Sequence, residues 1–124
     1  MFDVTPARRA TLAPGESAML DGLVASFAPV TRRVAGIRNE AAAIDPRASY
    51  RLPELEVPTL VVHAADDGLN PVRVGEHTAA HIRGAELVRL ETGGHLRMGH
   101  QDAIRARVNA FLARHRDPAA ATIR

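Results

Sequence analysis

The sequence predicts an α/β fold built on one βαβ unit between residues 57 and 95. A short apolar run, Thr59–Ala64, is rich in valine and shows no alternation, which is typical of a strand buried on both faces of a parallel sheet. A helical pattern follows it, and Glu86–Leu90 forms a second apolar run. A strand, a helix and a second strand in this order place the carboxyl ends of both strands at one edge of the sheet.

Composition and charge limit the classes of function. At 124 residues the chain is one domain at most, or part of a larger one. All 16 basic residues are arginine, scattered among 14 acidic ones, so we expect no nucleic-acid partner. The chain has no cysteine, which excludes disulfide and thiolate chemistry. Residues 1–14 lack the apolar core of a signal peptide and no stretch approaches the length of a membrane span, so we expect a cytoplasmic protein without a membrane partner.

The first 56 residues read as helices and loops. Residues 1–14 show no strong pattern, with Pro6 and Pro14 as breakers. A helix begins near Gly15, and a second helical pattern follows Pro29. Residues 45–50 are loop-like. The side chains expected on one face of the first helix are Met19, Leu20, Leu23, Val24 and Phe27, and those of the second are Val30, Val34, Ile37 and Ala41. Leu52–Glu56 has room for one helical turn.

Two further helices flank the second strand. Pro71 favours a helix from Val72 to about Ile82, and Gly84 closes it. Its inner stripe is small, so the helix can lie close to a sheet; the stripe is Val72, Gly75, Ala79 and Ile82. The last helix begins near Gln101 and ends before Asp117. Its inward residues are predicted to be Ile104, Val108, Phe111 and Leu112, and residues 117–124 are predicted to be a loose tail.

Polar residues follow each strand at the same rim. Asp66 and Asp67 come after the first strand, and His95 follows Gly93-Gly94 after the second. Each group by itself is typical of a polar turn. As an ordered pair at matching strand ends, an acid and a histidine indicate a catalytic site, because open α/β sheets carry their chemistry at this rim.

The other histidines allow alternative interpretations. Asp67, His95 and His100 have the residue types of a two-histidine, one-carboxylate metal set, but their spacing is not that of a helical zinc pair, so we expect neither a metal nor another cofactor. His100 is expected to cap the start of the last helix. His63, inside the first strand, is expected to be a core histidine with a hydrogen-bond partner.

Residues 57 to about 114 resemble the C-terminal third of an α/β-hydrolase. The similarity lies in the order and spacing of five motifs, which are Val57–Asp67, Asn70-Pro71, Ile82–Leu87, Gly93–His95 and Ala110–Leu112. The segment 30–56 is similar to the part that links a hydrolase lid to the last strands. The resemblance implies a partial α/β-hydrolase fold: a lid- or linker-like helical segment at 1–56, a C-terminal βαβα unit at 57–116, and a tail at 117–124.

The resemblance also implies a triad in the chain order nucleophile, acid, histidine. Asp67 lies three positions after the small residue Ala64, where the family has its acid, and Asp66 is the competing choice. His95 lies at the position of the family's histidine. In such a triad the acid orients the imidazole, and the histidine takes and returns the nucleophile's proton.

The nucleophile motif Gly-x-Ser-x-Gly is missing from the sequence. The only serines are Ser17, Ser26 and Ser49, and Gly15-Glu16-Ser17 reads better as a helix start. We therefore expect the C-terminal portion of a hydrolase for ester or related acyl bonds, active on a small ester-like substrate only when a nucleophile is supplied. The alternative is a non-catalytic remnant or a binding and assembly module. Unpaired strand edges also predict self-association or pairing with a missing N-terminal half.

Overall fold

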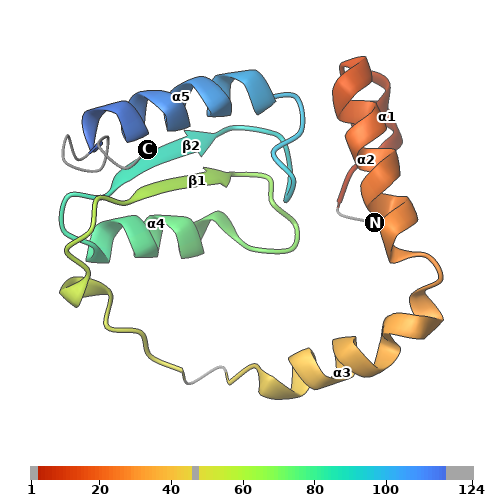
Figure 1. Ribbon diagram of the computed structural model, residues 1–124, viewed down its shortest axis with the longest axis horizontal. Coiled ribbons are helices and arrows are strands. Elements are labelled where there is room, and N and C mark those ends of the chain that lie inside the picture. The colour runs from red at the N-terminus through yellow and green to blue at the C-terminus, as the bar shows by residue number, and fades with distance from the viewer. Residues whose placement is uncertain (1–2, 46–47, 117–124) are drawn as a thin grey trace, which may run out of the picture.

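The computed structural model describes residues 3–45 and 48–116. Two strands and two of the helices, α4 and α5, form a small α/β unit, and the remaining helices precede it in the chain (Figure 1). In chain order the elements are α1 (Pro6–Ala10), α2 (Pro14–Phe27), η1 (Val30–Arg33), α3 (Val34–Ala43), η2 (Leu52–Glu54), β1 (Leu60–Ala64), α4 (Val72–His81), β2 (Glu86–Leu90) and α5 (Gln101–Arg114).

The predicted βαβ unit is confirmed. β1 and β2 pair in parallel, with a register that runs from Leu60 opposite Glu86 to Ala64 opposite Leu90. α4 and α5 lie on either side of this two-stranded sheet, and α1 and α2 lie beyond the carboxyl ends of the strands (Figure 1). The polar turns that follow the two strands therefore face the N-terminal helices.

Side chains alternate between the two faces of the sheet. His63 and Arg89 stand opposite each other on the face covered by α4, where Arg89 Nε lies 3.5 Å from Glu76 Oε1. Glu86 belongs to the other face and accepts a bond from Arg114 of α5 at 2.6 Å. Both faces of the sheet are thus joined to their covering helices by ion pairs.

Gly75 sets the distance between α4 and β1. It is buried, and a Cβ atom at this position would lie 2.7 Å from Nδ1 of His63. This confirms the prediction that a stripe of small residues lets the helix approach the sheet closely.

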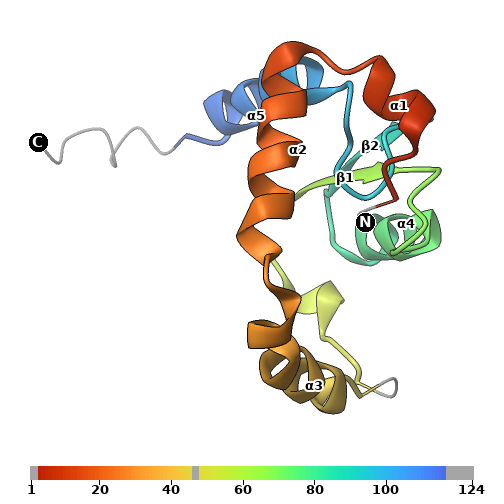
Figure 2. The ribbon, with the colours of Figure 1, turned by 90° about the vertical axis from the view of Figure 1, so that its right-hand side faces the viewer.

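The core is small. Among the described residues, the buried hydrophobic side chains are Leu20, Ala64, Ile82, Met98 and Phe111. Most of β1 is only half-buried, because the strand has a hydrogen-bonded neighbour on one edge alone. In both views α3 lies apart from the sheet (Figures 1 and 2). Several large apolar side chains therefore face solvent, with Ile44 at 74% and Val57 at 63% exposure.

Three expectations for the helices were wrong. Pro6 and Pro14 do not break structure but begin α1 and α2, since a proline at the first helical position loses no hydrogen bond. Leu112 is 58% exposed, because the neighbouring Phe111 faces the core and the next residue of a helix turns away from it. On α2, Met19 and Val24 are also exposed, since that helix buries a narrower stripe than its pattern suggests.

Other element boundaries agree closely with the sequence pattern. β2 and the start of α5 lie where they were predicted, and the helical turn near Leu52 is the short η2. No helix within the described ranges is long and apolar enough to cross a membrane. The tail at 117–124 lies outside the described residues.

Candidate active site

The turn after β1 presents two aspartates to opposite sides. The ladder continues one residue past the strand, with the Ala65 amide donating to the Leu90 carbonyl at 2.7 Å. The chain then turns, and the Asp67 amide donates to the Ala64 carbonyl at 3.3 Å. This tight turn places Asp66 and Asp67 at the rim of the sheet with separate partners.

Asp67 is a buried carboxylate held by its own turn. Its side chain is 4% exposed, and Oδ1 accepts bonds from the amides of Leu69 at 2.9 Å and Asn70 at 2.8 Å. Burial acts to raise the pKa of Asp67, but these two amides and the imidazole of His95 outweigh it and hold the pKa below its ordinary value. Asp67 is therefore an ionised acceptor at neutral pH.

His95 lies in the loop between β2 and α5, residues 91–100, which we call the histidine loop. The loop turns sharply because Gly93 and Gly94 adopt positive φ angles of 125° and 61°. Two backbone hydrogen bonds close the turn. The Arg97 amide donates to the Gly94 carbonyl at 3.0 Å, and the Met98 amide donates to the Gly93 carbonyl at 2.9 Å. A Cβ on Gly93 would lie 2.9 Å from the Arg97 Cα, so this close approach needs glycine.

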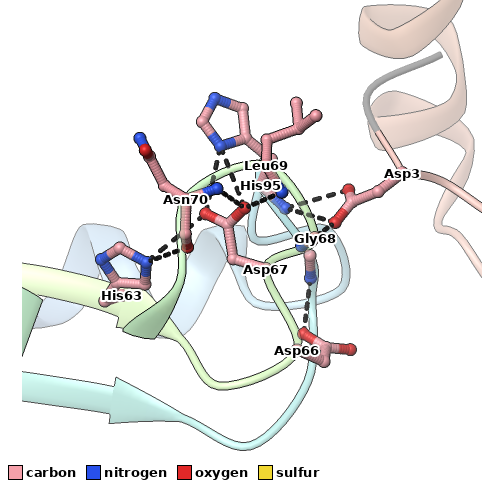
Figure 3. A network of polar contacts seen from close by, with 9 residues as sticks. Asp3, His63, Asp66, Asp67, Gly68, Leu69, Asn70 and His95 are labelled. Atoms are coloured by element: carbon pink, nitrogen blue, oxygen red, sulfur yellow. Dashed lines mark hydrogen bonds and ion pairs between the residues drawn. The ribbon is translucent and has the colours of Figure 1, made fainter. Parts of the chain in front are cut away.

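The turn and the histidine loop bring Asp67 and His95 into contact (Figure 3). His95 Nδ1 lies 3.0 Å from Asp67 Oδ2 and 3.3 Å from Oδ1. An ionised carboxylate only accepts hydrogen bonds, so Nδ1 carries the proton. Nε2 then has a free lone pair, and it has no hydrogen-bond partner among the residues the structure describes. With the His95 side chain 34% exposed, this nitrogen is accessible to a reacting group.

Asp66 has different partners from Asp67. Its Oδ1 accepts the Gly94 amide at 2.8 Å, and its Oδ2 pairs with the guanidinium of Arg8. Partial burial acts to raise the pKa of Asp66, but the Gly94 amide and Arg8 hold it below its ordinary value. Of the two aspartates, Asp67 faces the imidazole and Asp66 braces the backbone of the histidine loop.

His63 approaches Asp67 from the strand. Its Nε2 lies 2.9 Å from the Asn70 carbonyl and 3.5 Å from Asp67 Oδ2, and its side chain is 13% exposed. The expected hydrogen-bond partner is confirmed, but the expected core position is not, because His63 is only half-buried. The carboxylate of Asp67 thus lies between two imidazoles.

Sequence reasoning missed Asp3 and Arg8. One oxygen of Asp3 accepts the His95 amide at 3.0 Å, and the other accepts the Gly68 amide at 2.8 Å. These contacts join positions 92 and 65 residues apart, which no local spacing relates. The chain fold alone brings them to the site.

The serines do not contact the candidate base. Ser17 lies within α2, where its amide donates to the Ala13 carbonyl at 2.9 Å, and Ser26 Oγ bonds the Leu23 carbonyl at 2.7 Å. Ser49 is exposed in the loop before η2. In the described part of the chain, the polar partners of His95 come from aspartates, not from serines.

The side chain of His100 contacts Thr92, and the structure gives it no contact with Asp67 or His95 among the described residues. His100 occupies the N-cap position of α5, but its side chain makes no capping hydrogen bond to the helix, and its Nε2 lies 3.2 Å from Thr92 Oγ1 instead. Across residues 3–45 and 48–116, no group of three or more side chains gathers as metal ligands. A hollow of about 650 Å³ lies between the starts of α2 and α5, beside His100 and away from Asp67 and His95.

A parallel sheet with an acid and a histidine at the carboxyl ends of its strands is the arrangement that α/β-hydrolases have. A family model described as TAP-like protein, from the α/β-hydrolases, matches residues 35–123. The chain therefore belongs to the α/β-hydrolase family. The match confirms the resemblance drawn from the sequence and, with the parallel sheet, the α/β fold class.

A curated relative is similar over part of its length. The chain is 32% identical over 66 residues to a pimeloyl-[acyl-carrier protein] methyl ester esterase of Neisseria meningitidis serogroup C. The match covers 52% of this chain and 26% of the esterase. The chain thus spans about a quarter of the length of this relative.

Proposed function

We propose that this chain supplies the general base and its orienting acid to a hydrolase of ester or related acyl bonds. The observation that carries the proposal is the contact between Asp67 and Nδ1 of His95 at the ends of two paired parallel strands. The similarity to a methyl ester esterase supports the choice of an acyl bond. The substrate class is a small ester-like molecule.

In the proposed reaction, Nε2 of His95 removes the proton of a nucleophile as that nucleophile attacks the acyl carbon. Asp67 keeps the Nδ1 proton in place and stabilises the imidazolium that forms. The imidazolium then gives its proton to the departing alkoxide, which leaves as an alcohol. Water, activated by the same imidazole, releases the acid and restores the nucleophile.

The nucleophile is proposed to come from a partner segment. No described serine is a polar partner of His95, and β1 has one edge without a hydrogen-bonded neighbour. A strand that carries a Gly-x-Ser-x-Gly turn and pairs with this edge would end at the same rim as Asp67 and His95. Its serine would thus approach Nε2 from outside the described chain.

The test is to co-express the chain with the part of the related esterase that lies outside the matched region, and assay p-nitrophenyl butyrate. We expect turnover that falls by about 10³-fold or more in His95→Ala. His81→Ala is the matched control, because His81 is exposed on α4 and bonds only to its own helix. Turnover that survives His95→Ala would contradict the proposal.

A second candidate is a non-catalytic remnant that binds or assembles through its apolar surface. The observation in its favour is the exposure of large apolar side chains, such as Val57 before β1 and Ile44 at the end of α3. The chain would then self-associate or bind another protein through these apolar side chains. Hydrolysis by the chain alone that His95→Ala abolishes would exclude this candidate.

A further inference from the structure

Three carboxylates hold the backbone of the histidine loop. Asp66 accepts the Gly94 amide at 2.8 Å, Asp3 accepts the His95 amide at 3.0 Å, and Glu16 accepts the Gly99 amide at 2.8 Å. Asp3 and Glu16 belong to the N-terminal segment before and at the start of α2. The loop that carries the candidate base is therefore braced mainly by residues far away in the sequence.

Asp3 also contacts the turn that carries the acid (Figure 3). Its Oδ2 accepts the amide of Gly68, the residue after Asp67, at 2.8 Å, while Oδ1 accepts the amide of His95 itself. One carboxylate thus joins the two loops at the positions next to the interacting side chains. Hydrogen bonds to an ionised acceptor are shorter and stronger than neutral ones.

The backbone on both sides leaves room for this carboxylate. A Cβ on Gly94 would lie 2.5 Å from Asp3 Oδ1, so a larger residue there would displace Asp3. Asp3 itself has a φ angle of 52°, a conformation that aspartate tolerates better than most residues. Arg8, from α1, adds a second link through its ion pair with Asp66. The N-terminal segment is therefore joined to the turn of Asp66 and Asp67 at two points.

We propose that Asp3 is a positioning residue that fixes the contact between Asp67 and His95 by tying their loops together. It lies outside residues 35–123, so the family match does not include it. Without Asp3, the amides of Gly68 and His95 lose their shared acceptor, and the two loops can separate. The proposal rests on the proposed function only in naming His95 as a base, because the contact itself is measurable without turnover.

The test is an NMR comparison of the full chain with Asp3→Ala. In the wild type we expect a downfield resonance for the His95 Nδ1 proton, as its bond to Asp67 requires. In Asp3→Ala this signal broadens or disappears, and the amides of Gly68 and His95 exchange with solvent about tenfold faster or more. Asp3→Asn keeps one acceptor oxygen, so we expect it to recover part of the Nδ1 signal and part of the slow amide exchange.

Two sets of controls separate positioning from general stability. Asp21→Ala removes another N-terminal carboxylate, which pairs with Arg9 and not with either loop, and it should leave the His95 signal unchanged. Within Asp3→Ala, the amides of Ala65 and Glu86 should keep their exchange rates, because they bond the Leu90 and Thr59 carbonyls along the ladder between the strands and not Asp3. Equal acceleration of strand and loop amides would overturn the proposal, and so would an intact Nδ1 signal.

A direct measurement on the wild type covers the case in which the variants do not fold. A scalar coupling across the hydrogen bond from the His95 amide nitrogen to the Asp3 carboxyl carbon is expected, and its absence would overturn the proposal. None of these readouts uses catalysis. Loss of the Nδ1 signal in Asp3→Ala would stand even if His95→Ala left hydrolysis intact, which would contradict only the proposed function.

Discussion

At the scale of single residues, the site depends on the protein groups that bond the carboxylate of Asp67 in place of water. Its carboxylate has exchanged water for two backbone amides and one imidazole, all of which donate to it. A buried carboxylate in this position is stabilised only while it stays ionised. This makes the acid both the orienting partner of His95 and a source of acid sensitivity.

The lowered pKa of Asp67 predicts a defined pH dependence. A carboxyl group that binds protons less readily when folded favours folding above its ordinary pKa of 3.8, and this contribution is lost as pH falls through the folded value. We expect the free energy of unfolding, measured in urea, to fall as pH drops from 5 to 3, and Asp67→Asn to flatten that dependence. At pH 7 the variant should be less stable by about 1–3 kcal/mol.

Asp102→Asn is the matched control for this experiment, because that side chain is 96% exposed and keeps its contact with water. An unfolding free energy that falls with pH as steeply in Asp67→Asn as in the wild type would contradict the assignment. In that case Asp66, which also has a lowered pKa, would be the group to replace next.

At the scale of elements, the packing of α4 on β1 explains how the rim is built. Gly75 lets the helix lie against His63, and the same imidazole bonds the Asn70 carbonyl in the turn that holds Asp67. The position of the helix, the strand histidine and the turn are therefore coupled. A change in how α4 packs on β1 should therefore move His63 and, through it, the turn that holds Asp67.

Gly75→Ala tests this coupling. Its Cβ would overlap Nδ1 of His63, so we expect the unfolding free energy to fall by about 1–3 kcal/mol. Gly36→Ala is the matched control, since Gly36 is also helical but faces open space and should gain about 0.5–1 kcal/mol. Urea unfolding of both variants gives the comparison, and equal effects of the two changes would refute the close contact.

The elements also show what the local pattern predicted well. β1, β2 and the glycine of the inner stripe followed from apolar runs and helical spacing, because each depends on burial against an immediate neighbour. The misplaced side chains lie on helices with little to cover. Leu112, for example, has the right spacing to face inward, but the neighbouring Phe111 faces the core and Leu112 turns away from it.

At the scale of the whole molecule, the sheet is small for the apolar surface that surrounds it. β1 and β2 each have one edge without a strand in the described chain, and apolar side chains such as Val57 and Ile44 face solvent. Unpaired strand edges and apolar patches favour association with another chain.

We therefore expect the isolated chain to self-associate as its concentration rises. Light scattering after size exclusion should give a mass above the 13.3 kDa of the monomer. Val57→Lys, just before β1, should lower that mass, because a charged residue beside a strand edge opposes pairing. Leu112→Lys, which changes an equally apolar exposed residue on α5, is the control. A monomer at all concentrations would refute this prediction.

The sequence by itself determined the βαβ unit, the family and the rim that carries Asp67 and His95. These depend on apolar periodicity and motif spacing, which are local along the chain. The family spacing already favoured Asp67 over Asp66, and the structure shows that Asp67 faces the imidazole. Tertiary structure alone decided that Asp3, Arg8 and Glu16 reach the same loops. Such contacts join residues up to 92 positions apart, and they form only because the fold returns the N-terminal segment to the carboxyl ends of the strands.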